Sequence, residues 1–312
     1  MSPFVSNGAG LLGTCGIFGL LLFILQLWKK KTRPSIKTKV ILITGATSGV
    51  GKASAELFYM AGCRVILAAR NLEHLKKIQQ EFYSKKKGGI PAPPAILQLD
   101  LSNLASIPEK VTQAISFYGQ IDVLINNAGQ SYRGRVEDTS LDVDIRLMTV
   151  NYLGHVAITK AVLPYMIKEG GGHIIGVSSI QGKISIPYRS AYSASKHAFQ
   201  AFFDCLRAEV CDKNITVSVL SPSYIKTNLS LNALKADGTQ YNVMDKTTEQ
   251  GMSPEYVAKK ILDTVLYKQQ DICLTPLHHK IAVFLRAVFP NLFFKLMASR
   301  ALKQRSEYCK VE

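Results

Sequence analysis

A tyrosine and a lysine four residues apart are the first residues in this sequence whose types and spacing could do chemistry. Tyr192-Ser-Ala-Ser-Lys196 lies in a stretch with a helical pattern, so the two side chains share one helix face. A phenol with a pKa of about 10 is a poor base at neutral pH, but a nearby ammonium can lower that pKa by roughly 1–3 units. Tyr192 is therefore a candidate proton donor to a carbonyl or acceptor from an alcohol. The pair alone is also common on exposed helices.

A glycine-rich segment supports this interpretation. The run Thr44-Gly-Ala-Thr-Ser-Gly-Val-Gly51 follows an apolar, strand-like stretch and precedes a helical pattern. Its three glycines allow a tight turn and a close approach of the backbone to a pyrophosphate at the helix N-terminus. Glycines before a helix also occur in ordinary turns, but this context favours dinucleotide binding. We expect the cofactor to contact Gly45, Ser48, Gly49, Val50 and Gly51.

The end of the next predicted strand indicates which cofactor is bound. NAD-binding proteins place an acidic residue there for the ribose 2′-hydroxyl, whereas a 2′-phosphate needs a cation. This chain has Ala69-Arg70-Asn71 and no carboxylate nearby. Arg70 can pair bidentately with a phosphate. A solvated arginine at a strand end would leave the missing acid unexplained, so the sequence predicts NADP(H).

Several segments, in this order along the chain, resemble the short-chain dehydrogenase/reductase family. The glycine turn has the family's T-G-x-x-x-G-x-G form, Asn126-Asn-Ala-Gly129 resembles its N-N-A-G signature, and Ser179 precedes Tyr192 by thirteen residues. The segment Pro222-Ser-Tyr-Ile-Lys-Thr227 is similar to the family's P-G-x-x-x-T segment, with Ser223 where glycine is usual. The resemblance covers residues 39 to about 268. The segments 179–187, 202–209 and 296–300 are similar to a membrane-anchored vertebrate subgroup of the family that is associated with the endoplasmic reticulum.

The resemblance implies a role for each matching residue. Tyr192 would be the acid/base, Lys196 would tune its pKa and bind the ribose, Ser179 would bind and orient the substrate carbonyl, and Asn151 would act in a water relay. The implied cofactor-binding residues include Tyr192 and Lys196 and, beyond the glycine turn, Arg70, Asn71, Asp100, Leu101, Asn127, Ala128, Gly129, Ile225 and Thr227. Ser48 departs from many NADP-dependent members, which carry a basic residue in the turn.

Strand-like and helical stretches alternate through most of the chain, which predicts one doubly wound, Rossmann-type α/β domain with a parallel sheet. The polar segment 222–252 has no strong period and is expected to form a mobile loop over the site. Strands are predicted at 39–44, 64–69, 95–99, 121–126, 173–178 and 215–220, and helices at 72–87, 106–118, 142–166 and 190–212.

The N-terminus predicts a membrane anchor. Residues 8–28 contain Gln26 as their one strongly polar side chain, and 21 helical residues span a hydrocarbon core of about 30 Å. A cleaved signal peptide would need basic residues before this stretch and a small-residue cleavage site after it. We therefore expect an anchor with its basic flank at 1–38, the oxidoreductase domain at 39–275, and an apolar, basic tail at 276–312 forming a membrane-surface helix. Topology stays open: the cluster from Lys29 to Arg33 favours a cytosolic domain, whereas sequons at Asn214 and Asn228 could be glycosylated only in a lumenal one.

Composition excludes other classes of protein. The net charge of +16 comes from scattered cations, and the chain has no nucleic-acid recognition motif. Attraction to anionic lipid headgroups accounts for these cations as well as nucleic-acid binding would. The six cysteines form no C-x-x-C pair, and the sequence shows no recognisable metal-binding pattern. Together with the family resemblance, which implies an oxidoreductase and the endoplasmic reticulum, the sequence predicts a membrane-bound NADP(H)-dependent enzyme that acts on a small hydrophobic substrate: a steroid, retinoid or lipid ketone. A catalytically silent, membrane-tethered NADP-binding interaction protein is the alternative, and the sequence leaves open whether the chain forms a homo-oligomer.

Overall fold

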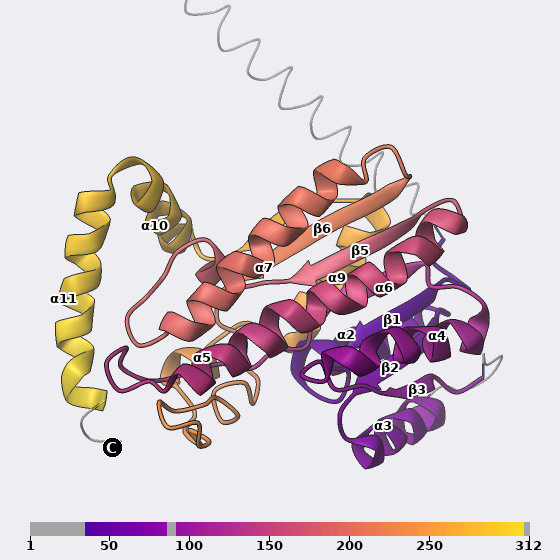
Figure 1. The fold of residues 1–312 in the computed structure, drawn as a ribbon, viewed down its shortest axis with the longest axis horizontal. Helices are drawn as coiled ribbons and strands as arrows, with labels where there is room; N and C mark the ends of the chain where they lie inside the picture. The colour runs from indigo at the N-terminus through magenta and orange to yellow at the C-terminus, as the bar shows by residue number, and fades with distance from the viewer. Residues whose placement is uncertain (1–34, 86–91, 309–312) are drawn as a thin grey trace, which may run out of the picture. The chain divides into compact units, whose positions relative to one another are not determined.

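A parallel sheet of seven strands lies at the centre of the structure, a computed structural model that describes residues 35–85 and 92–308 (Figure 1). The strand order is β3-β2-β1-β4-β5-β6-β7. Most strands are short apolar runs buried on both faces, as a sheet covered by helices requires. The strands are β1 (Val40–Thr44), β2 (Arg64–Ala69), β3 (Ala95–Gln98), β4 (Val123–Asn126), β5 (Gly172–Val177), β6 (Ile215–Pro222) and β7 (Asp271–Leu274).

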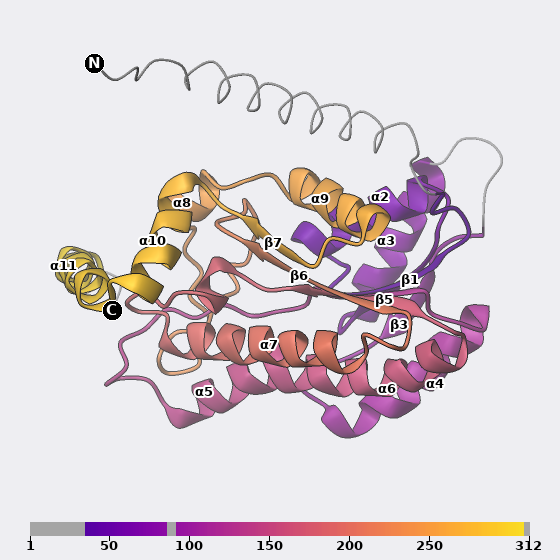
Figure 2. The same ribbon diagram turned by 90° about the horizontal axis from the view of Figure 1, so that it is seen from above.

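Helices cover the two faces of the sheet (Figure 2). The helices α2 (Gly49–Met60), α3 (Leu72–Lys85) and α9 (Pro254–Tyr267) lie on one face, and α4 (Ile107–Tyr118), α6 (Gly154–Lys168) and α7 (Ser190–Glu209) lie on the other. Leu124 and Ile174 from the sheet are fully buried in the same apolar cluster as Phe199 and Phe203 of α7. Burial of these large side chains fixes α7 against the sheet.

Strands β2 and β3 lie on one side of β1, whereas β4 to β7 lie on the other, and this change in the direction of strand order positions the site. Residue Ile41 of β1 pairs with Val65 of β2 on one side and with Val123 of β4 on the other. The connections that leave β1 and β4 run to opposite faces of the sheet, which opens a crevice at the carboxyl ends of the strands. Ligands of doubly wound folds bind in such crevices.

The predicted Rossmann-type architecture is confirmed, with several differences in its elements. Strand β7 and helix α9 were not predicted. The stretch predicted as one helix at 142–166 is α5 (Leu141–Met148), a π-helical turn (Thr149–Leu153) and α6. The predicted polar loop contains a short helix, α8 (Lys246–Glu249).

The tail forms two helices where one was predicted, α10 (Leu277–Val288) and α11 (Pro290–Tyr308). Proline fits the first turn of a helix but cannot continue one, so Pro290 begins α11 after a break at Phe289. The predicted anchor at 8–28 lies outside the described residues. Within residues 35–85 and 92–308, no helix has the length and apolar character that crossing a membrane requires.

Candidate active site

A cavity of about 860 Å³ lies at the carboxyl ends of the strands, within the size range of small-molecule sites. Thr44, Ala69, Val177 and Pro222, at the ends of four strands, all line it. The cavity brings together most of the predicted site residues: Gly45, Ser48, Gly49, Val50, Arg70, Asn71, Asp100, Leu101, Asn127, Ala128, Gly129, Ser179, Tyr192, Lys196, Ile225 and Thr227. Gly51 and Asn151 do not line it.

The glycine turn has the backbone that its sequence predicts. Gly45 and Gly49 have φ values of +68° and +51°, in the left-handed region that favours glycine. A Cβ on Gly51 would lie 2.1 Å from the carbonyl oxygen of Gly45, so any side chain there would separate α2 from the turn. Gly51 therefore acts by close packing, and the turn leaves the N-terminus of α2 at the cavity.

The segment after β4 is fixed by buried polar side chains. The backbone amides of Asn127 and Ala128 donate to Thr44 Oγ1 at 2.9 and 3.1 Å, and Asn127 Nδ2 donates to the Thr44 carbonyl at 2.9 Å. The ring nitrogens of His155 lie 3.0 Å from Asn126 Oδ1 and 2.8 Å from the Ala128 carbonyl. Burial lowers the pKa of His155 to about 3, so its imidazole is neutral. This network joins the ends of β1 and β4 beneath the cavity.

The predicted catalytic side chains meet at one wall of the cavity. Tyr192 and Lys196 come from α7, and Ser179 is the second residue after the end of β5; all three are buried. The Lys196 ammonium lies 6.0 Å from the centre of the Tyr192 ring and donates to the Val177 carbonyl at 3.1 Å. Ser179 Oγ accepts a hydrogen bond from the Gln181 amide at 3.1 Å. The helix spacing of four residues thus places the phenol and the ammonium on one face, as predicted.

The protonation of Tyr192 differs from the prediction. We expected Lys196 to lower its pKa, but burial raises the pKa of Tyr192, while Ser179 and the charge of Arg133 act in the opposite direction. Burial also lowers the pKa of Lys196 to about 8. Both pKa shifts arise because burial disfavours the charged form of the group. At neutral pH Tyr192 is therefore a neutral phenol that can donate a proton.

Asn151 sits in the π-helical turn rather than in a regular helix. Its Oδ1 accepts from the Gln130 amide and its Nδ2 donates to the Gln130 carbonyl, both at 2.8 Å. Its Nδ2 also lies 3.0 Å from Ser195 Oγ, one residue before Lys196. Asn151 therefore joins the segment after Gly129 to α7. Its role in a water relay stays a prediction.

Arg133 lines the cavity and was not predicted from the sequence. Its Nε donates to Asp245 Oδ2 at 2.9 Å, and its Nη1 donates to Ser131 Oγ at 2.6 Å. Arg189 adds a second cation 3.5 Å from the same carboxylate. Because Asp245 is 112 residues from Arg133, no local sequence signal indicated the pair. The ion pair holds the loop that contains Asp245 against the cavity wall.

Comparisons with known proteins agree with this site. The family model described as short chain dehydrogenase matches residues 39–237. The chain is 51% identical over 289 residues to "Dehydrogenase/reductase SDR family protein 7-like" of Drosophila melanogaster, covering 91% of this chain and 88% of that protein. It is also 51% identical over 296 residues to "Dehydrogenase/reductase SDR family member 7B" of Bos taurus, covering 95% of this chain and 90% of that protein. The chain is thus similar over nearly its whole length to proteins named SDR family member 7B or 7-like.

A solved structure shares the fold. The short chain dehydrogenase/reductase from Burkholderia phymatum, described in complex with NAD, superimposes with a TM-score of 0.73 at 22% identity. The match covers 83% of this chain and 96% of that one. Together with the glycine turn, the cavity and the Ser179, Tyr192 and Lys196 cluster, these matches show that the chain belongs to the short-chain dehydrogenase/reductase family of oxidoreductases, whose fold binds NAD(P).

Proposed function

We propose that this protein is an NADP(H)-dependent oxidoreductase that interconverts a carbonyl and an alcohol on a hydrophobic, lipid-like substrate such as a steroid, retinoid or lipid ketone. The observation that carries the proposal is the meeting of Tyr192, Ser179 and Lys196 at one wall of a cavity that opens along the glycine turn. The bound nicotinamide would supply or accept the hydride.

The residues around the cavity fit a dinucleotide. The turn of Gly45, Gly49 and Gly51 forms a cradle that side chains would fill, beside the N-terminus of α2. An ammonium has three N–H donors, and Lys196 uses one of them on Val177. No carboxylate in the described part of the chain pairs with it. Its other donors suit the hydroxyl groups of a ribose.

The phenol of Tyr192 suits proton transfer to a carbonyl oxygen. Because burial raises its pKa, Tyr192 carries its proton at neutral pH. The Ser179 hydroxyl accepts from Gln181 and can still donate its own proton to the substrate oxygen. In the reverse direction, Tyr192 must first lose its proton, so alcohol oxidation is favoured at higher pH.

The preference for NADP(H) is supported by the charges at the end of β2. Arg70 is exposed at the cavity, and none of the carboxylates described in the structure forms an ion pair with it. Asn71 Oδ1 accepts from the His74 amide at 2.9 Å and so caps the start of α3. His74 also lines the cavity and was not predicted. A cation next to a helix N-terminus suits a ribose 2′-phosphate.

Substitution of Arg70 tests this preference. Arg70→Ala removes a charged hydrogen bond, so NADPH should bind more weakly by about 1.5–3 kcal/mol, or roughly 10- to 150-fold. NADH lacks the 2′-phosphate and should bind with unchanged affinity. Fluorescence titration of both cofactors measures this, with Lys77→Ala as the control, because Lys77 is an exposed cation of the neighbouring helix α3. An equal loss for the two cofactors would refute the assignment.

The lining of the cavity supports a hydrophobic substrate. Apolar side chains from several segments line the cavity, among them Ile180, Tyr224, Leu229 and Leu234. A panel of steroid, retinoid and other lipid ketones, incubated with NADPH and the full-length protein, should contain one that supports NADPH oxidation. A protein that binds NADPH but reduces none of them would instead fit the silent, membrane-tethered binding protein.

A further inference from the structure

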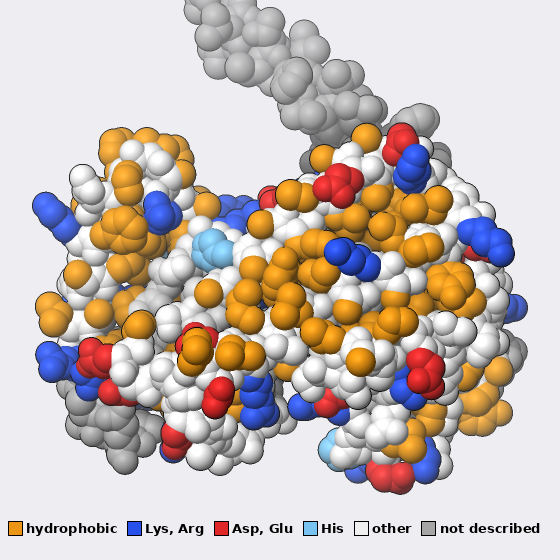
Figure 3. Space-filling model, in the orientation of Figure 1, with side chains coloured by type: hydrophobic (Ala, Val, Ile, Leu, Met, Phe, Trp, Pro, Cys, Tyr) orange, Lys and Arg blue, Asp and Glu red, His pale blue; other side chains and the backbone are white. Residues whose placement is uncertain are grey.

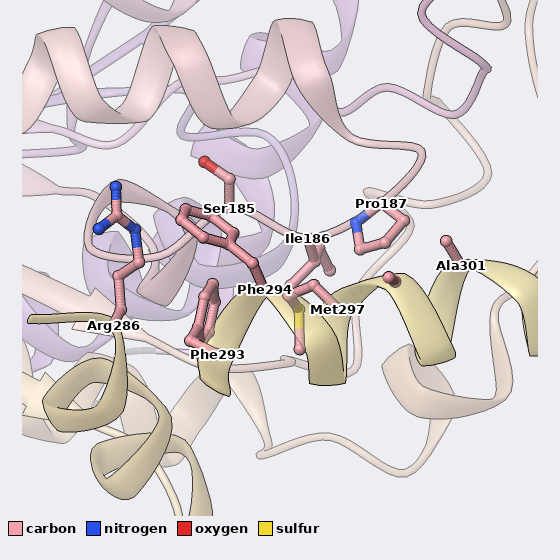
Figure 4. Close-up of a pocket in the computed structure, with 9 residues that line it drawn as sticks. Ser185, Ile186, Pro187, Arg286, Phe293, Phe294, Met297 and Ala301 are labelled. Carbon is pink, nitrogen blue, oxygen red and sulfur yellow. The ribbon is translucent and has the colours of Figure 1, made fainter. Parts of the chain in front are cut away.

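The two C-terminal helices attach to the domain by one face. Phe293 of α11 is buried in a cluster with Ile180 and Ile184, next to a cavity of about 390 Å³ between α11 and the 185–187 segment (Figure 4). Polar contacts add to this attachment: His279 Nδ1 lies 2.8 Å from Ser223 Oγ, and Tyr188 donates to the Ala301 carbonyl at 3.1 Å. The position of α10 is thus tied to Ser223, which lines the candidate active site.

The opposite face of α10 is apolar and exposed. Leu277, Ile281, Phe284 and Val288 follow each other at intervals of four, three and four residues, so they form one stripe along the helix. Their exposed fractions are 72%, 48%, 58% and 51%. The space-filling view shows hydrophobic side chains gathered at the end of the molecule that α10 and α11 form (Figure 3). We call these four residues the α10 stripe. A contiguous exposed apolar surface of this kind marks an interaction site.

The charges around the α10 stripe distinguish between partners. The segment from Ile272 to Ser306 contains no aspartate or glutamate, while it contains the six cations Lys280, Arg286, Lys295, Arg300, Lys303 and Arg305. A second copy would bring the same cations against these, and like charges repel. An anionic lipid surface offers both apolar depth and opposite charge.

We propose that the α10 stripe inserts into the headgroup region of an anionic bilayer, with Lys280 and Lys295 contacting lipid headgroups. Helices that combine an apolar face with basic residues bind membranes in the plane of the interface in this way. The contact places the segment around Ser223 close to the bilayer surface. The docking itself does not depend on which substrate or cofactor the site binds.

A single tryptophan at the α10 stripe tests the insertion. Trp28 is the one tryptophan of the chain, so the double variant Trp28→Phe/Phe284→Trp carries one reporter on the stripe. The full-length variant is reconstituted into vesicles of phosphatidylcholine and phosphatidylserine whose acyl chains are brominated. We expect loss of tryptophan fluorescence relative to unbrominated vesicles. Trp28→Phe/Leu277→Trp provides a second reporter on the same stripe, in case Phe284→Trp disturbs folding.

Control variants and lipids decide between the alternatives. Trp28→Phe/Tyr83→Trp places the reporter at an exposed position of α3 and should keep its fluorescence. Vesicles without phosphatidylserine, or the added substitutions Lys280→Glu and Lys295→Glu, should reduce the quenching at the stripe. The proposal is wrong if the stripe reporters are quenched no more than the α3 reporter. A blue shift of the stripe reporters that grows with protein concentration and occurs without quenching would indicate contact with a second copy and would overturn the proposal. Equal quenching by neutral and anionic vesicles would also overturn it.

Discussion

Tyr192 and Lys196 are buried titratable residues with opposite pKa shifts. Burial raises the pKa of Tyr192 and lowers that of Lys196 to about 8, because each group loses the solvation of its charged form. At pH 7 the site therefore holds a neutral phenol and an ammonium, the forms that carbonyl reduction requires. An anionic dinucleotide that contacts Lys196 would favour the ammonium and raise its pKa.

Cofactor binding should therefore take up protons in mildly alkaline solution. With a pKa of about 8 in the free protein, Lys196 is partly deprotonated between about pH 8 and 9 and must regain its proton when the cofactor binds. Calorimetric titration of NADPH in buffers of different ionisation enthalpy measures the uptake, and the affinity should fall as the pH rises above about 8. Lys196→Arg keeps its charge throughout this range. Uptake of the same size in Lys196→Arg would show that another group titrates.

At the scale of elements, buried histidines connect the strands to their surroundings. His155 of α6 contacts the end of β4, and His173 of β5 lies 2.7 Å from Ser218 Oγ of β6. Burial lowers their pKa values to about 3 and about 4. In the unfolded chain both would titrate near the ordinary pKa of about 6.5.

Acid should therefore destabilise the fold through these histidines. Below about pH 6.5 the unfolded chain binds protons that the native protein does not, so the free energy of unfolding falls with pH down to about pH 4. Each histidine contributes about 1.4 kcal/mol per pH unit within this window. Urea unfolding followed by circular dichroism at several pH values measures the slope. His173→Gln keeps a polar side chain at Ser218 and should reduce that slope; an unchanged slope would contradict the assignment.

The sequence predicted the main elements because each has a strong local pattern, and the misses have local causes. Strand β7 has four residues, none of them buried, so it lacks the apolar run of the other strands. The π-helical turn at Asn151 does not interrupt the apolar pattern on either side of it. Helix α9 did carry a signal: Ser253 precedes Pro254, and its Oγ accepts from the Tyr256 amide at 3.2 Å.

Within the site, motif residues were predictable and environments were not. The positions of Tyr192 and Lys196 follow from their spacing along one helix, and that of Ser179 follows from the apolar strand that ends two residues before it. The pKa of Tyr192 depends on burial by the whole fold, and the ion pair between Arg133 and Asp245 joins distant segments. Such effects require the tertiary structure.

At the scale of the whole molecule, we expect two different attachments to membranes. Residues 8–28 are predicted to span the bilayer, whereas the α10 stripe is proposed to lie in its surface. A spanning helix resists alkaline carbonate, while a surface contact that depends on charge does not.

Carbonate extraction of cell membranes should distinguish the two attachments. The full-length protein should stay in the membrane pellet with an uncleaved N-terminus. A chain that begins at Ser35 should be released by carbonate although the α10 stripe is intact. Release of the full-length protein, or a mature N-terminus beyond residue 28 found by sequencing, would exclude the anchor.

Turnover by Tyr192→Phe measures whether Tyr192 transfers the proton in the proposed carbonyl–alcohol interconversion. The variant keeps the buried ring but loses its hydroxyl, so NADPH affinity should be unchanged. Its kcat for a ketone that the wild type reduces should fall by about 10²- to 10⁴-fold, the usual contribution of general acid catalysis. NADPH oxidation followed by absorbance provides the measurement. Full turnover by Tyr192→Phe with an unchanged pH profile would contradict the mechanism.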